Sequence, residues 1–271
     1  MSEFTRFEVV DNIGILTLCR PPVNAVNEEM KLDIIELLES LNDGRIDVYA
    51  LIIRSELEKG FCGGSDTKEW YVPEKAANVA PLIDRMQEAI FKCNVPIISA
   101  VNGWCIGLGF AMVSLTDVII AEEGSWFMFP EVNVGTVGGP MWLTRIMQEK
   151  AARYYLMTGE KIPAEEMYRL GIVLKVTEKG QLMEEAMNVA RKLAAKYPPT
   201  LWAIKTIINK TELEVQDVIE VTRTMRKYGN TTLLGGDPNK REMTVAFNEH
   251  RKPVYVLAYL EKAQKTIKET R

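Results

Sequence analysis

The chain has 271 residues, of which 47% are hydrophobic and 26% charged, and its 33 Lys and Arg against 37 Asp and Glu give a net charge of −4. This composition is typical of a soluble globular protein with one large core, because single cores rarely grow beyond about 250–300 residues. The negative balance disfavours a surface for nucleic acid. The single histidine, His250, disfavours a His-rich zinc site and histidine acid–base chemistry.

The cysteines and the N-terminus indicate the compartment. Cys19, Cys62, Cys93 and Cys105 lack the CxxC spacing typical of a metal site, so we expect buried thiols in a reducing environment. No apolar stretch approaches the roughly 20 residues that a membrane span needs. The first ten residues lack the charged and apolar regions of a secretory signal. We therefore expect a cytoplasmic protein without a membrane partner.

Strand and helix signals alternate in the first half of the chain. Residues 7–10 and 14–18 predict a hairpin across Asp11 and Asn12, and Asn27 predicts the N-cap of a helix with regularly spaced apolar residues. Further predicted elements are a strand at 48–53, a helix at 79–91, a strand at 96–101, a short helix at 107–115 and a strand at 117–121. Continuous apolar strands separated by helices require a sheet covered on both faces, which predicts an α/β fold.

From about Leu143 onward the signals are almost entirely helical. Candidate helices are residues 150–158, 164–169, 180–196, 200–210, 214–228 and 237–249, followed by an amphipathic segment at 254–271. Their apolar faces must be buried against the protein's own core or against a partner subunit. We divide the chain into a core of residues 1–195 and a helical region of residues 196–271.

Three polar or glycine-rich turns, at residues 60–67, 102–109 and 129–139, follow predicted buried strands. Such turns are where an α/β protein exposes backbone amides to a ligand. Glycines let N–H groups approach closely, so these turns can hold a negative charge that develops on an oxygen. Each turn taken alone is more often only a turn, and none contains the pattern of a phosphate-binding loop.

Taken together, in this order and spacing, the turns resemble the crotonase, or enoyl-CoA hydratase/isomerase, superfamily. The similar segments are RPPVNAVN at 20–27, FCGGSD at 61–66, AVNGWCIGLG at 100–109, PEV at 130–132, MTGEKI at 157–162, AEE at 164–166, GIV at 171–173 and AFNEHR at 246–251. Only residues from Val254 onward lack a counterpart. The resemblance implies a spiral of ββα repeats with a C-terminal helical region that assembles homotrimers or dimers of trimers.

The resemblance also implies an acyl-CoA thioester as substrate, whose carbonyl oxygen is held by two backbone N–H groups. Carried over residue by residue, these donors belong to Ser65 and Leu108. CoA enters as part of the substrate, so neither a separate cofactor nor a metal is implied. Leu108 replaces the family's usual glycine. Its side chain either reshapes the acyl pocket or only packs at a helix start in a degenerate site, since a backbone position that needs an unusual φ tolerates leucine poorly.

Glu131 is the candidate catalytic acid and base. Hydratases of this family use two glutamates, and here the first position is Ala111 while Glu131 keeps the second. A single carboxylate can take a proton from one carbon and return it to another, which is the chemistry of a double-bond isomerase. It can also assist hydration or retro-aldol cleavage if another group activates the water. Similar single-glutamate patterns occur in Δ3,Δ2-enoyl-CoA isomerases and hydroxycinnamoyl-CoA hydratase-lyases.

Nearby acids have alternative interpretations. Glu131 follows an apolar segment, residues 126–129, so we expect it to be desolvated, which favours proton uptake; the alternative is a solvated or salt-bridged loop acid. We expect Asp66 to order its own turn and Asp117 to be structural. Gly139 stands where dienoyl-CoA isomerases carry an additional acid, which disfavours that activity.

The remaining site residues follow from the same resemblance. The substrate-binding candidates are Asn24, Ala25, Gly63, Gly64, Asp66, Gly107, Trp70, Ala111, Met112, Phe129, Val134, Gly139 and Trp142. Their aromatic content favours a bulky or cyclic acyl group. The CoA phosphates can meet basic residues, of which Arg20, Lys68, Arg251 and Lys252 are candidates, although surface cations are usually only solvated.

We therefore predict an acyl-CoA enzyme of the enoyl-CoA hydratase/isomerase kind. Two alternatives use the same scaffold. One is an acyl-CoA hydrolase or decarboxylase. The other is a non-catalytic acyl-CoA-binding protein in which Leu108 has closed the oxyanion hole, the site between the two N–H donors. Nucleic-acid binding, known for some relatives of this family, lacks support from the net charge of −4.

Overall fold

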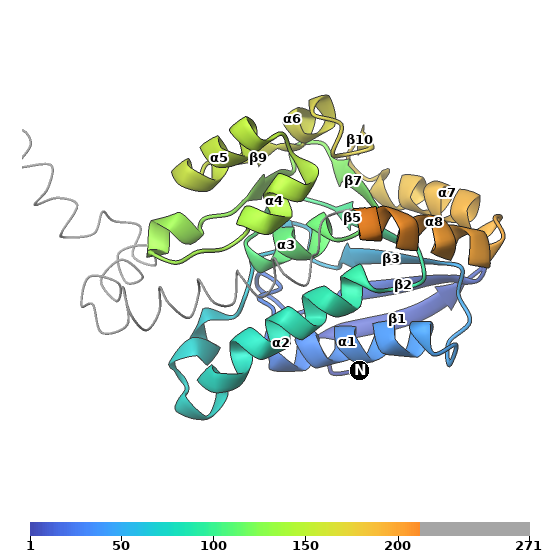
Figure 1. The fold of residues 1–271 in the computed structure, drawn as a ribbon, viewed down its shortest axis with the longest axis horizontal. Helices are drawn as coiled ribbons and strands as arrows, with labels where there is room; N and C mark the ends of the chain where they lie inside the picture. The colour runs from blue at the N-terminus through green and yellow to red at the C-terminus, as the bar shows by residue number, and fades with distance from the viewer. Residues whose placement is uncertain (212–271) are drawn as a thin grey trace, which may run out of the picture.

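The strands of the computed structural model, which describes residues 1–211, form two sheets (Figure 1). The larger sheet has the strand order β1-β2-β3-β5-β7-β10, and the smaller one has the order β4-β6-β8-β9. The larger sheet consists of β1 (Thr5–Val10), β2 (Ile13–Leu18), β3 (Ala50–Ser55), β5 (Ile97–Val101), β7 (Val118–Glu122) and β10 (Lys175–Thr177). The smaller sheet consists of β4 (Gly60–Cys62), β6 (Trp104–Ile106), β8 (Trp126–Met128) and β9 (Ile162–Pro163).

Successive windings of the chain repeat one pattern, two strands followed by a helix. The chain runs through β3, β4 and α2 (Pro73–Phe91), then β5, β6 and α3 (Leu108–Ser114), then β7, β8 and α4 (Pro140–Ile146). In each of these windings the first strand joins the larger sheet and the second strand joins the smaller one. The predicted α/β spiral of ββα repeats is therefore confirmed.

The larger sheet is covered on both faces, as its continuous apolar strands predict. On one face Ile52 and Ile98 pack against α7 (Leu182–Ala194). On the other face their neighbours Leu51 and Ile97 belong to the main core. That core also contains the apolar side chains of α2 and of α1 (Glu28–Asn42), and these two helices lie side by side (Figure 1). The alternation arises because successive residues of a strand point to opposite faces.

Local signals predicted the first elements well. Asp11 and Asn12 have φ values of 54° and 58°, the conformation of a tight hairpin turn that joins β1 to β2. Asn27 caps α1, because its side-chain oxygen accepts a hydrogen bond of 3.1 Å from the Met30 N–H. Both predictions are confirmed.

The smaller sheet was not predicted. Strands β4, β6 and β8 lie within or beside the segments expected to be turns. Strand β9, and also β10 of the larger sheet, lie where the signals were expected to be helical. Three-residue strands carry too little sequence for alternation to show, so their pairing is decided by the neighbouring strands. The later predicted helices are present as α5 (Glu149–Thr158), α6 (Ala164–Arg169), α7 and α8 (Pro198–Thr211). The predicted helices 214–228 and 237–249, the segment 254–271, His250, Arg251 and Lys252 lie outside the described residues.

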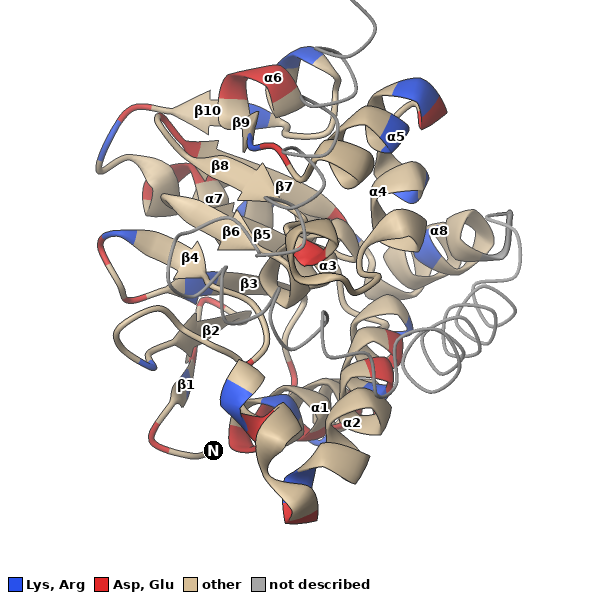
Figure 2. Ribbon diagram, turned by 90° about the vertical axis from the view of Figure 1, so that its left-hand side faces the viewer, with Lys and Arg blue, Asp and Glu red and all other residues tan. Residues whose placement is uncertain are grey.

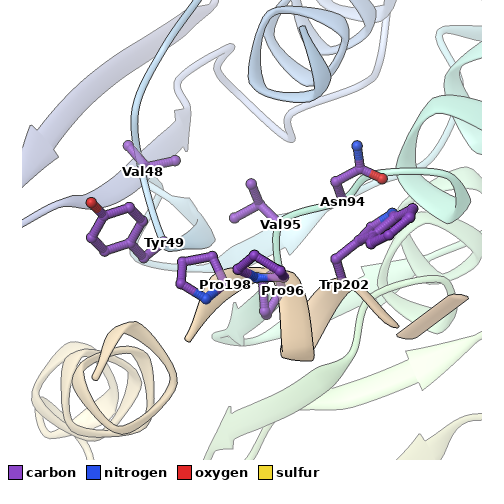
Figure 3. Close-up of a pocket in the computed structure, with 8 residues that line it drawn as sticks. Val48, Tyr49, Asn94, Val95, Pro96, Pro198 and Trp202 are labelled. Atoms are coloured by element: carbon purple, nitrogen blue, oxygen red, sulfur yellow. The ribbon is translucent and has the colours of Figure 1, made fainter. Parts of the chain in front are cut away.

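Helix α8 is joined to the core through Asp117. The Lys205 Nζ donates to Asp117 Oδ2 at 2.7 Å, and the same oxygen accepts the Ile97 N–H at 2.7 Å. Asp117 therefore has the structural role that we expected. An apolar cavity of about 420 Å³ opens between α8 and the segments that precede β3 and β5 (Figure 3). These segments lead into the amino ends of the parallel strands β3 and β5. The cavity therefore lies at the opposite end of these strands from the turns that follow their carboxyl ends.

The described surface carries both signs of charge. Lys and Arg segments are interspersed with Asp and Glu segments on the outer helices and loops, while β6 and β8 carry no charge (Figure 2). Within residues 1–211, no helix combines the length and apolar character that crossing a membrane requires.

Candidate active site

The three turns identified in the sequence lie at one edge of the smaller sheet. Residues 63–67 follow β4, residues 107–109 follow β6, and residues 129–139 follow β8. These three strands are parallel neighbours, so the segments that leave their carboxyl ends are brought together. Pairing between strands far apart in sequence therefore assembles the predicted site.

Two glycines face each other across the first two turns. Gly64 has a φ of 102° and Gly107 a φ of 53°, conformations that disfavour other residues. A β carbon added to Gly64 would lie 3.7 Å from the Leu108 nitrogen, and one added to Gly107 would lie 3.9 Å from the Gly64 Cα. Each glycine immediately precedes one of the predicted donors, Ser65 and Leu108, and the absence of side chains leaves space between the two turns.

The backbone N–H groups of Ser65 and Leu108 are available. Ser65 forms an isolated bridge with Val26 in which the Gly64 carbonyl accepts and the Asp66 N–H donates, so the Ser65 N–H faces away from that bridge. Leu108 is the first residue of α3, where an N–H has no acceptor within the helix. Over residues 1–211, neither N–H donates a hydrogen bond to another group of the chain.

Leu108 is compatible with this geometry. The positive φ that we expected to disfavour leucine belongs to Gly107, and Leu108 itself is helical. Its side chain is 7% exposed and belongs to the main core. Leu108 therefore packs at the helix start and still presents its N–H.

Glu131 lies against the second of these turns. It begins a short 3-10 helix, η2 (Glu131–Val134), directly after Pro130. A β carbon on Gly107 would lie 3.0 Å from Glu131 Oε1, and one on Gly138 would lie 2.6 Å from Glu131 Cδ. The side chain is thus packed between Gly107 and Gly138, and its Oε2 atom is inaccessible to solvent. This environment differs from that of a solvated loop acid.

Asp66 and Asn24 shape the loops around this space. Asp66 caps the 3-10 helix η1 (Thr67–Tyr71) by accepting the Lys68 N–H at 3.0 Å, so it orders its own turn as expected. Asn24 is fully buried, with its Nδ2 donating to Ser55 Oγ at 2.8 Å and its Oδ1 accepting the Arg20 N–H at 2.7 Å. The Asn24 side chain therefore holds the loop instead of presenting its amide to a substrate.

The predicted acyl-pocket residues are mostly part of the core. Ala111, Met112, Phe129 and Trp142 are each at most 4% exposed, while Trp70 and Val134 are partly exposed. Ala25 and Gly63, which are substrate-binding candidates outside the acyl pocket, are also partly exposed. Phe129 stacks on Phe110 with ring centroids 4.6 Å apart. A β carbon on Gly139 would lie 2.4 Å from the Phe129 ring, so this backbone leaves no room for an acid at position 139.

The cysteines among residues 1–211 are free thiols. Cys62, Cys93 and Cys105 are buried free thiols, as predicted, whereas Cys19 is partly exposed. Burial raises the pKa of the Cys62 thiol to about 12, so it is not a thiolate at neutral pH. No cluster of three His, Cys, Asp or Glu residues in this part of the chain has the arrangement of a metal site.

Two ion pairs beside the site were not predicted from the sequence. Arg20 Nη2 lies 2.7 Å from Asp66 Oδ2, and the fully buried Lys31 Nζ lies 2.9 Å from Glu69 Oε2. Lys31 did carry a signal: it falls on the apolar face of α1 with Ile34, Ile35 and Leu38, where a lysine needs a buried partner. The partner itself is distant in sequence and could not be named.

Replacing Gly138 by Ala tests the catalytic role that the sequence predicts for Glu131, and we expect it to lower turnover about a hundredfold with little loss of stability. The backbone of Gly138 is not in the left-handed region, so alanine is allowed, but its methyl group would overlap Glu131 and displace the carboxylate. A misplacement of about 1 Å at a reacting group can cost about 10²-fold in rate. Steady-state kinetics and thermal unfolding measure the two effects. Gly171→Ala is the control: it meets only open space at a φ of 74°, so it should cost stability and leave turnover unchanged.

The chain is similar to known proteins over most of its length. Residues 8–256 match the family model for enoyl-CoA hydratase/isomerase. A (7aS)-7a-methyl-1,5-dioxo-2,3,5,6,7,7a-hexahydro-1H-indene-carboxyl-CoA hydrolase of Mycobacterium tuberculosis is 32% identical over 208 residues, 74% of this chain and 82% of the relative. Carnitinyl-CoA dehydratase of Escherichia coli is 30% identical over 263 residues, 94% of this chain and 99% of the relative.

A solved structure agrees with these matches. The crystal structure of an enoyl-CoA hydratase from Mycobacterium smegmatis superposes with a TM-score of 0.73 at 25% identity, covering 93% of this chain and 98% of that one. The chain therefore belongs to the enoyl-CoA hydratase/isomerase family, the crotonase superfamily, and is an acyl-CoA-processing enzyme.

Proposed function

We propose that this enzyme stabilises the enolate of a CoA thioester with the Ser65 and Leu108 N–H groups and moves protons with Glu131. The reaction is double-bond isomerisation or hydration of an enoyl-CoA, with CoA entering as part of the substrate. One observation carries the proposal: Glu131 Oε1 and the Gly64 Cα both lie within 4 Å of the point that a Gly107 side chain would occupy. The acid and the two donor turns thus border one small space.

Each group has a distinct role in this mechanism. Removing a proton next to the thioester carbonyl places negative charge on the carbonyl oxygen, and one pre-aimed donor lowers such a barrier by roughly 2.7–4 kcal/mol. Glu131 takes the proton and can return it to another carbon, which completes an isomerisation. Hydration needs in addition a group that holds the water. Ala111, which stands at the place of the hydratases' other glutamate, has no polar side-chain atom for this.

The relatives support acyl-CoA chemistry and add a second candidate function. The name of carnitinyl-CoA dehydratase describes the removal of water from a CoA thioester, which is hydration in reverse. The 32% identical relative is named as a hydrolase of a bicyclic carboxyl-CoA. Hydrolysis of a cyclic acyl-CoA is therefore the second candidate, and it agrees with the bulky acyl group expected from the sequence.

The test is turnover of straight-chain and cyclic enoyl-CoA thioesters in heavy-oxygen water, followed by mass spectrometry. Isomerisation moves the double bond without incorporating label, hydration adds one labelled oxygen to a product that is still a thioester, and hydrolysis labels a carboxylic acid. The first two outcomes support the proposal, and hydrolysis alone supports the second candidate. Absence of turnover on every thioester would contradict both.

A further inference from the structure

Arg20 is held on several sides beside the loop that carries Ser65. Its Nη2 donates to Asp66 Oδ2 at 2.7 Å, its Nη1 donates to the Ala25 carbonyl at 2.7 Å, and its guanidinium lies 5.2 Å from the centre of the Phe4 ring. The side chains of Arg20 and Asp66 are only 24% and 11% exposed. The charge of this guanidinium is already paired with Asp66, and two of its five N–H groups donate within the chain, which argues against the CoA-phosphate contact considered for Arg20.

The contacts of Arg20 converge on the peptide that carries the Ser65 N–H. The Gly64 carbonyl accepts the Val26 N–H at 2.7 Å, and the Asp66 N–H donates to the Val26 carbonyl at 3.0 Å. The residues on both sides of Ser65 are therefore tied to Val26. Arg20 adds a side-chain link between Ala25, which precedes Val26, and Asp66, which follows Ser65.

Asp66 transmits this link because both of its oxygens are engaged. Oδ2 accepts from Arg20, and Oδ1 accepts the Lys68 N–H at 3.0 Å. Without Arg20, a carboxylate that is nearly buried would lose its counter-charge and would have to turn toward water. The backbone at Ser65 would then rotate with it.

We propose that Arg20 is a positioning residue that aims the Ser65 N–H at the thioester oxygen by acting through Asp66. The inference rests on the proposed function of Ser65 as a donor. A donor lowers the barrier only when it points to the place where charge develops, so misalignment costs more in the transition state than in the bound substrate. Loss of Arg20 should therefore lower kcat and leave KM nearly unchanged, whereas loss of a phosphate contact should raise KM.

The experiment compares kcat and KM of the wild type, Arg20→Met, Arg20→Lys, Asp66→Asn and the double variant Arg20→Met/Asp66→Asn. We expect Arg20→Met to lower kcat by about 10-fold to 100-fold with KM changed by less than about twofold. Arg20→Lys should retain part of the kcat that Arg20→Met loses, because lysine keeps the positive charge but lacks the planar guanidinium that can bind Asp66 and the Ala25 carbonyl together. The double variant should be no slower than Arg20→Met, since two residues that act as one unit are not additive. Arg6→Met, at the exposed pair with Glu56, is the matched control and should keep wild-type kcat.

Hydrogen exchange provides a measurement that needs no substrate. Peptides that cover residues 63–69 should exchange faster in Arg20→Met than in the wild type or in Arg6→Met. Unchanged exchange, or a raised KM at wild-type kcat, would overturn the positioning role. A wild type that turns over no thioester would overturn the proposed function instead, and the exchange result would still decide whether Arg20 orders this loop.

Discussion

Replacing Glu131 by Gln is expected to lower turnover by about 10²-fold to 10⁴-fold, the range that a positioned general acid or base contributes. Glutamine has nearly the same shape as glutamate, so it should fit between Gly107 and Gly138 without repacking. It cannot take up the α-proton, and the enolate therefore would not form. The thioester would still meet the Ser65 and Leu108 N–H groups, so KM should change little.

The measurement is steady-state kinetics on the thioester that the wild type turns over, with thermal unfolding to check the fold. Glu165→Gln is the matched control, because Glu165 is exposed on α6 and the charge change is the same. Wild-type turnover in Glu131→Gln would contradict the role of Glu131 and would show that another group moves the proton. A loss of equal size in Glu165→Gln would point to net charge instead of chemistry.

Replacing Lys31 by Met is expected to lower the free energy of unfolding by about 3–5 kcal/mol, the usual cost of removing one partner from a buried ion pair. Lys31 is fully buried, and Glu69 is 6% exposed with its other oxygen accepting the Glu28 N–H at 2.8 Å. Methionine fills the volume of the lysine stem but leaves the Glu69 charge without its close partner. Lys75 is 45% exposed and lies 3.8 Å from Glu69 Oε1, so it compensates only in part.

Urea unfolding of Lys31→Met, Glu69→Gln and the double variant measures this pair. The double variant should be more stable than Lys31→Met, because neutralising Glu69 removes the uncompensated charge. A loss below about 1 kcal/mol in Lys31→Met, the range of exposed pairs, would show that water reaches Glu69 after the substitution.

Local sequence patterns were sufficient for much of the fold. The hairpin turn at Asp11 and Asn12, the cap at Asn27 and the long strands of the larger sheet each carry their signal within a few residues. The smaller sheet does not, since its three-residue strands exist only through pairing with one another. The turn residues of the site could be named, but their meeting depends on that same pairing.

Backbone conformation and ion pairs between residues far apart in the sequence also could not be predicted. The sequence does not show that the positive φ before α3 belongs to Gly107, and therefore it cannot decide whether leucine suits position 108. The structure places Leu108 in the helix. Arg20 and Asp66 are 46 positions apart, and Lys31 and Glu69 are 38 apart, so neither partner could be chosen from periodicity.

The spiral has a consequence for how such an enzyme can change its chemistry. The winding β3-β4-α2 supplies Ser65, the next winding β5-β6-α3 supplies Leu108, and β7-β8-α4 supplies Glu131. The proposed oxyanion donors and the proposed proton carrier thus stand on separate windings, or modules, of the chain. A substitution in the third module can alter or relocate the acid while the donors of the first two keep their geometry, so one scaffold can exchange reactions without rebuilding its recognition of the thioester.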